Sequence, residues 1–206
     1  MAVFPISKLS KSELSDFWDD LNYLNTAEIK SFCDWHSIPY RIAIEAGDGR
    51  RKKTRDDDRK GVMLHRLRHF LKTGVVLPET VFPASVVCFD PLPENPAPDD
   101  RLYYGQYDKA NRAMIGLLQE LTGGHFRNGA IARILARQFW SGGAAPTFRE
   151  YAMAWLEETR SHTKPNPEWA FLSDRASGQA HGDWKKVRSA KAAKVMKLLR
   201  QVSARR

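Results

Sequence analysis

The sequence has little cysteine and no long apolar run. Its 206 residues include only two cysteines, Cys33 and Cys88, too few for the disulfide framework of a small secreted protein. No apolar run approaches the roughly 20 residues that a membrane-spanning helix needs. The opening MAVFPISKLS has no basic segment followed by an apolar one, as a secretory signal would. We therefore expect a cytoplasmic protein with no membrane partner.

The local motifs of common enzymes are also missing. The chain contains no Gly-x-Ser-x-Gly elbow, no Walker loop and no Gly-x-Gly-x-x-Gly. Cys33 and His36, and likewise His65 and His69, have spacings that zinc sites use, but Cys33 falls on the apolar stripe of an expected helix. We predict a non-enzymatic protein with no metal site and no cofactor. A site assembled from distant residues is the alternative, which a deep polar cleft would favour.

Positive charge is concentrated in the second half of the chain. The net charge is +9, yet residues 1–100 hold 14 basic and 16 acidic residues, whereas residues 101–206 hold 19 and 8. Residues 184–206 contain nine cations and no acid. This asymmetry favours an anionic partner, most often nucleic acid. A solvated basic helix that only aids solubility is the simpler alternative.

Two helices are expected at the start of the chain. The first covers residues 11–21 and begins at Ser10, a residue type that caps helices. The second covers residues 26–36, where Asn25 and Glu28 have the spacing of a capping box. Both carry apolar residues at helical spacing, so each should bury one face.

A β-hairpin and a third helix are expected next. The alternating RIAIE, the turn sequence GDG and the basic RKKTR predict a hairpin over residues 40–57. The third helix covers residues 58–72 and ends at Gly74. We interpret the acidic triplet at residues 56–58 as the cap of this helix rather than as a metal or nuclease site, because acids stabilise helix N-termini.

A proline-rich stretch suggests a domain boundary. Four prolines in DPLPENPAPDD favour extended backbone, so we expect an acidic linker over residues 91–101. The predicted domains are then residues 1–90, with the hairpin inserted, and a helical bundle over residues 102–206. The fold class that we expect is mainly α.

The second half should be helical throughout. Asp108 is the expected cap of one helix, and Thr147 with Glu150 the capping box of another. The last helix covers residues 184–202. Its expected apolar line consists of Trp184, Val187, Val195, Leu198 and Val202. Its expected cationic side consists of Lys186, Lys194, Lys197 and Arg200. Four aromatic residues could stack bases, although we favour packing: Trp155, Trp169, Phe171 and Trp184.

The first half resembles the SAP domain, a small helix–extended–helix DNA-binding module. LNTAEIKSFC at residues 24–33 is similar to its first helix, SIP at residues 37–39 to its turn, and DRKGVMLHRL at residues 58–67 to its second helix. The resemblance covers about residues 24–72, interrupted by the hairpin. In the second half, TFREY and GDWKKVR are similar to bacterial proteins that join a SAP-like module to a helical domain.

The resemblance implies duplex DNA bound mainly through phosphates, with low sequence specificity. Arg59 and Lys60 match basic positions of the family, and the hairpin could extend that track. The residues we expect to bind nucleic acid are Arg51, Lys52, Lys53, Arg59, Lys60, Arg66, Lys186, Lys194, Lys197 and Arg200. The alternative is a protein-interaction adaptor whose basic C-terminal helix docks on an acidic partner.

Overall fold

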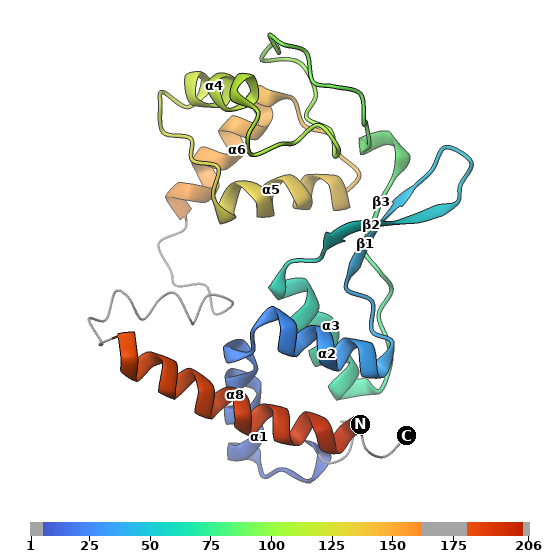
Figure 1. The fold of residues 1–206 in the computed structure, drawn as a ribbon, viewed down its shortest axis with the longest axis vertical. Coiled ribbons are helices and arrows are strands. Elements are labelled where there is room, and N and C mark those ends of the chain that lie inside the picture. Colours follow the sequence, from blue (N-terminus) through green and yellow to red (C-terminus); the bar gives the residue numbers. More distant parts are fainter. Residues whose placement is uncertain (1–5, 162–180, 204–206) are drawn as a thin grey trace. The chain divides into compact units, whose positions relative to one another are not determined.

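The structure is a computed structural model that describes residues 6–161 and 181–203 (Figure 1). Helices predominate, beside one small sheet, so the chain is mainly α. It divides into two compact units, and neither is continuous in sequence. Of the described residues, unit 1 contains 6–41, 57–79 and 181–203, and unit 2 contains 42–56 and 80–161.

Unit 1 is a group of helices around one apolar core. Its elements are η1 (Ile6–Lys8), α1 (Lys11–Asp20), η2 (Leu21–Tyr23), α2 (Thr26–His36), α3 (Lys60–Thr73) and α8 (His181–Ser203). The capping boxes at Ser10 and Asn25 are confirmed: each side chain accepts a hydrogen bond from the third helical N–H. Gly74 ends α3 with φ +75°, a conformation that glycine adopts without strain.

Helix α8 packs in unit 1, against α1, η2 and α2. It buries four residues at helical spacing, namely Ala192, Val195, Leu199 and Val202. The expected apolar line was therefore partly wrong: Val187 is 44% exposed, and Leu198 is only partly buried. The side chain of Trp184 lies outside the described residues. The buried stripe is rotated because the helix sits on α1 and α2, which the local pattern could not indicate.

Unit 2 combines the sheet with three helices. Its elements are β1 (Arg41–Glu45), β2 (Arg51–Asp57), β3 (Val81–Phe82), η3 (Ala84–Val86), α4 (Arg112–Leu121), α5 (Ala130–Ser141) and α6 (Phe148–Ser161), with the two outer residues of the hairpin counted in unit 1. The strand order is β2-β1-β3, and β1 pairs in parallel with β3, with Ala43 opposite Val81.

The hairpin is present as predicted. We had expected it as an insertion in an N-terminal domain, whereas most of it lies in unit 2. Ile42 and Ile44 are buried in the core of unit 2 with Phe82. They alternate with other residues of β1, so one face of the strand enters this core. Figure 1 shows the tip of the hairpin extending away from α4, α5 and α6.

The proline-rich stretch at residues 91–101 is not a linker between domains. It lies within unit 2 and bonds to the start of α6: the Arg149 N–H donates to the Pro98 carbonyl at 2.9 Å, and the Phe148 N–H donates to the Asp100 carbonyl at 3.0 Å. Prolines lack an N–H but keep their carbonyl acceptors, so this extended chain can still be held by its neighbours.

Two predicted helix starts are wrong. Helix α3 begins at Lys60 with Arg59 at the N-cap and no side-chain cap, so the acidic triplet does not cap it. Helix α4 begins at Arg112, capped by Asn111 and not by Asp108. Asp108 instead accepts a hydrogen bond from the Ala110 N–H at 2.9 Å. Nearby backbone geometry, and not residue type alone, decides which side chain caps a helix.

A buried ion pair joins the start of α3 to its middle. Arg66 pairs with Asp58, and the two side chains are only 6% and 4% exposed. The Arg66 guanidinium also donates to the carbonyls of Pro39 (3.1 Å) and Pro78 (2.9 Å). Arg66 therefore stabilises unit 1 and is not accessible to a nucleic acid, contrary to the sequence-based expectation.

Replacing Arg66 should destabilise unit 1 strongly. Arg66→Met leaves the Asp58 carboxylate buried without its cation, so we expect a loss of about 3–5 kcal/mol in the free energy of unfolding. Asp58→Asn with Arg66→Met should cost less than the sum of the single changes, because the neutral pair leaves no charge uncompensated. Urea denaturation followed by circular dichroism measures both.

The exposed pair Asp48–Arg50 supplies the matched control. Its side chains are 46% and 87% exposed, so solvent screens the pair and Asp48→Asn should lower the free energy of unfolding far less than Arg66→Met does. If Arg66→Met costs no more than this control, the buried pair does not have the role described.

Candidate nucleic-acid interface

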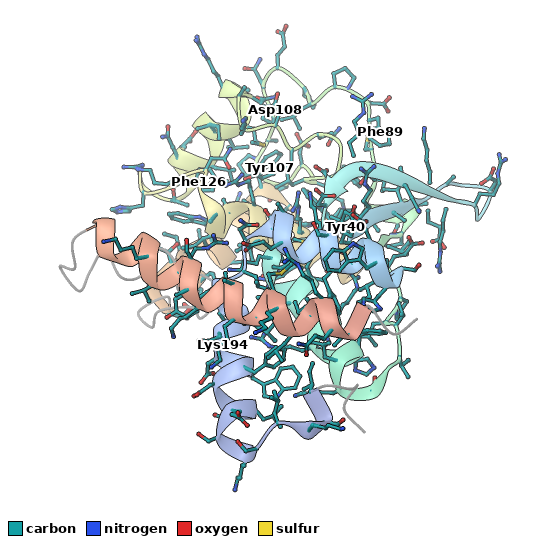
Figure 2. All side chains as sticks on the ribbon, turned by 60° about the horizontal axis from the view of Figure 1, so that its bottom comes forward. Tyr40, Phe89, Tyr107, Asp108, Phe126 and Lys194 are labelled. Atoms are coloured by element: carbon teal, nitrogen blue, oxygen red, sulfur yellow. The ribbon has the colours of Figure 1, made fainter. Side chains whose placement is uncertain are left out.

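The outer face of α8 carries a set of exposed cations. Lys186, Lys194, Lys197 and Arg200 are all exposed, on the side away from the buried stripe. Figure 2 labels Lys194 on this helix. Lys186, Lys197 and Arg200 make no ion pair with any described residue, and the sequence has no acid after residue 183.

The cations on the inner face of α8 have partners in the rest of unit 1. Arg188 pairs with Glu28 and donates to the Tyr23 carbonyl at 3.1 Å. Lys191 lies 3.0 Å from Asp20 and 4.3 Å from the centre of the Tyr23 ring. The hydrogen bond to Asp20 raises the pKa of Lys191. Where α8 packs on the rest of unit 1, its positive charges are therefore compensated by acidic side chains or lie over an aromatic ring.

Lys194 lies at the edge between these two faces. It is exposed, but its charge reaches Glu13 on α1. The pKa of Glu13 is lowered chiefly by hydrogen bonds from the Ser10 hydroxyl and N–H, with a smaller effect of Lys194. Among the side chains of α8 that the structure describes, the uncompensated cations on the outer face are therefore Lys186, Lys197 and Arg200.

Strand β2 in unit 2 presents a second basic segment. Arg51, Lys52 and Lys53 are exposed, in the positions that the sequence predicted for a basic strand. Arg50, just before the strand, is held by Asp48 through its Nε at 2.6 Å. Lys52 and Lys53 have no such partner among the described residues.

The start of α3 is less open than the SAP resemblance implies. Lys60 is half-buried, and its ammonium donates to the Asn22 carbonyl. Arg59 is half-buried at the N-cap. Of the two positions that match the family's basic residues, Lys60 is therefore engaged within unit 1.

The end of β2 is tied to unit 2 by Asp56. The Tyr104 hydroxyl donates to Asp56 Oδ2 at 2.7 Å, and Arg137 Nη2 lies 3.6 Å from Oδ1. Burial and the bond to Asp56 raise the pKa of Tyr104 to about 12, so the hydroxyl stays a donor at neutral pH. This contact was not expected, since Asp56 had been interpreted as part of a helix cap.

These residues border a pocket within unit 2, which we call the α5 pocket. It has a volume of about 380 Å³, and six of the residues that line it are Asp56, Phe89, Tyr104, Tyr107, Arg133 and Trp140. Phe89, Tyr107 and Asp108, another lining residue, are labelled in Figure 2. Of the aromatic residues that we had considered for base stacking, Trp155 is buried and does not line this pocket. Trp169, Phe171 and the side chain of Trp184 lie outside the described residues.

The zinc-like spacings do not form a metal site in the part of the chain that the structure describes. Cys33 is fully buried, and burial raises the pKa of its thiol to about 12. His36 packs between the rings of Phe32 and Phe70, with centroid distances of 4.4 and 4.8 Å. Both residues belong to the core of unit 1.

Comparison of the chain with protein-family models, with curated proteins and with solved structures finds no match. The SAP resemblance therefore stays a prediction. Between residues 6 and 161 and between 181 and 203, no helix has the length and hydropathy that crossing a bilayer requires.

The two cysteines should differ sharply in reactivity. Only the thiolate attacks a disulfide reagent, and with a pKa of about 12 roughly one Cys33 in ten thousand is ionised at pH 8. Cys88 is half-exposed, so it should react first with dithionitrobenzoate, and Cys33 only on unfolding. Cys88→Ser should abolish the fast phase of the absorbance change, whereas Cys33→Ser should keep it. A fast phase in Cys88→Ser would show that Cys33 is accessible.

Proposed function

We propose that the protein binds duplex DNA through its phosphates, with low sequence specificity and without catalysis. The observation that carries the proposal is the outer face of α8, where Lys186, Lys197 and Arg200 are exposed without an acidic partner among the described residues. A cation on a phosphate releases condensed counterions, which is the main source of sequence-independent affinity for DNA.

The contrast between the two faces of α8 supports this proposal over a role in solubility. Arg188 and Lys191, which contact the rest of unit 1, are paired with Glu28 and Asp20. Acidic partners are therefore present where α8 packs on its neighbours. On the outer face, Lys186, Lys197 and Arg200 span more than three turns and pair with no acid among the described residues. A surface made only for solubility works with mixed charges, whereas a phosphate-binding surface needs one sign.

Two further groups fit the same proposal. Lys52 and Lys53 on β2 offer long side chains with a cationic tip, and Arg59 stands at the uncapped start of α3. The SAP resemblance adds α2 and α3 as a helical pair of the kind that contacts DNA backbone. Contacts of this sort position a protein on the duplex but carry no sequence information, hence the low specificity that we propose.

Neutralising α8 should weaken DNA binding and flatten its salt dependence. For a labelled random-sequence duplex, we expect the variant K186Q/K197Q/R200Q to lower the slope of log K against log salt by about 2 to 3, because each lost phosphate contact removes about 0.9. Fluorescence anisotropy between 50 and 300 mM salt measures the slope.

The matched control removes three exposed cations elsewhere. K11Q/R112Q/R160Q changes the net charge equally at positions on α1, α4 and α6, so it should leave most of the slope intact. Equal slopes for the two triple variants would show that total charge, and not α8, drives binding. No binding by the unmodified chain at 50 mM salt would overturn the proposal and favour an adaptor that docks on an acidic protein.

The basic strand allows a separate prediction. K52Q/K53Q should lower the same slope by about 1 to 2 with no change in sequence preference, since both residues are exposed on β2. Thermal unfolding should be unaltered, because both side chains are exposed and neither forms a hydrogen bond or an ion pair with another described residue. An unchanged slope would exclude Lys52 and Lys53 from the DNA-binding surface.

A further inference from the structure

The α5 pocket is built on three aromatic rings in fixed positions. Trp140 is 3% exposed, and its indole N–H donates to the Leu102 carbonyl at 3.0 Å. Tyr104 and Tyr107 stand nearly perpendicular to it, with centroids 5.5 and 5.9 Å away and interplanar angles of 71° and 79°. Each ring is held by a hydrogen bond, Tyr104 to Asp56 and Tyr107 to Asn128. The inner surface is therefore rigid, apolar and aromatic.

A fourth ring lies at the pocket and is largely exposed. Phe89 is 67% exposed, which is unusual for so large an apolar side chain. The carbonyl group of the preceding Cys88 and the Phe89 ring lie close to Gly105, where φ is +101° and a Cβ would come within 2.3 Å of the Cys88 oxygen and 2.8 Å of Phe89 Cδ1. The Cys88 N–H donates to the Tyr104 carbonyl at 2.9 Å. Phe89 is thus presented by fixed backbone, as a ring on which a planar ligand could stack.

The charges around the pocket favour an anion. The lining holds three cations, Lys109, Arg133 and Arg137, against two carboxylates, Asp56 and Asp108. Arg137 pairs with Asp56, whereas Asp108 accepts a hydrogen bond from a backbone N–H of its own turn. Arg133 and Lys109 also line the pocket, and neither forms an ion pair with a described residue. A cage for a quaternary ammonium ion would instead combine aromatic rings with uncompensated acids. The pocket therefore suits a planar ring that carries a negative group.

We infer that the α5 pocket binds one nucleotide, with the base against Phe89 and Tyr107 and the phosphate near Arg133 and Lys109. The volume of about 380 Å³ lies in the range of small-ligand sites. Base stacking on aromatic rings with a cation on the phosphate is the chemistry of nucleotide recognition in single-strand binders. The same chemistry serves a free mononucleotide or an unpaired nucleotide of a strand.

This inference goes beyond the proposed function and does not depend on it. The duplex surface uses cations on α8 and β2, and none of Lys52, Lys53, Lys186, Lys197 and Arg200 lines the pocket. Failure of duplex binding would leave nucleotide binding open, and the reverse also holds. The variants below separate the two, because Arg133 and Phe89 are not among the proposed duplex contacts.

The test is calorimetric titration of the full chain with adenosine 5′-monophosphate, adenosine, ribose 5-phosphate and a single-stranded hexanucleotide. We expect the monophosphate or the hexanucleotide to bind at least tenfold more tightly than adenosine or ribose 5-phosphate, because each fragment lacks one half of the recognised chemistry. Binding of the monophosphate alone indicates a free nucleotide as the source, and binding of the hexanucleotide alone indicates a strand.

Two exposed residues provide variants that should fold normally. R133Q and Phe89→Ala should each weaken the bound ligand at least tenfold, with unchanged circular dichroism and unchanged duplex affinity. R112Q, an exposed arginine on α4 outside the pocket lining, is the matched control and should bind as the unmodified chain does. The inference is overturned if neither nucleotide ligand binds at about 10 mM, if R133Q binds no more weakly than R112Q, or if tetramethylammonium binds in their place.

Discussion

Three successive carboxylates, Asp56, Asp57 and Asp58, have separate partners, and much of the structure depends on that separation. Asp56 is bound by Tyr104 and Arg137 in unit 2, whereas Asp57 pairs with Lys30 and Asp58 with Arg66 in unit 1. Adjacent carboxylates repel one another unless their charges are drawn apart and compensated. Asp56 and Asp57 end a strand, so their side chains leave it on opposite sides. The chain leaves unit 2 after Asp56 and enters unit 1 at Asp57, and each of the three carboxylates is compensated within its own unit.

Local features of the sequence were sufficient for most of the elements but not for their assembly. The capping boxes of α1 and α2 and the terminal Gly74 are short-range interactions within a few residues, so the sequence alone predicts them. Which unit the hairpin and α8 join depends on contacts between residues far apart in the chain, such as Arg188 with Glu28. The prediction of a linker at the proline-rich stretch was wrong for the same reason. Its composition indicates extended backbone but not the hydrogen bonds that join it to the start of α6.

The residues of the candidate sites also divide into those that local spacing predicts and those that depend on contacts between distant parts of the chain. Exposure of Lys197 and Arg200 follows from helical spacing, because a helix with one apolar stripe must turn its other side to water. Burial of Arg66 could not be derived from spacing, because Arg66 bonds to the carbonyl groups of Pro39 and Pro78. In the sequence, Pro39 precedes the hairpin and Pro78 follows α3, so only the fold brings both to Arg66. The rings of the α5 pocket come from α5 and from irregular chain before α4. No motif marks such a set, and only the fold brings it together.

The outer face of α8 has a physical cost that bears on its role. Lys194 and Lys197, and then Lys197 and Arg200, are three residues apart on one helix, and like charges at this spacing destabilise a helix by about 0.2–0.5 kcal/mol per pair. Nothing in the packing of unit 1 requires that cost, because the buried stripe and the paired Arg188 and Lys191 already hold the helix. A bound polyanion would relieve the repulsion, and binding to the folded state alone would add stability by mass action. The charge that weakens the free helix is therefore the charge that the proposed complex with DNA would use.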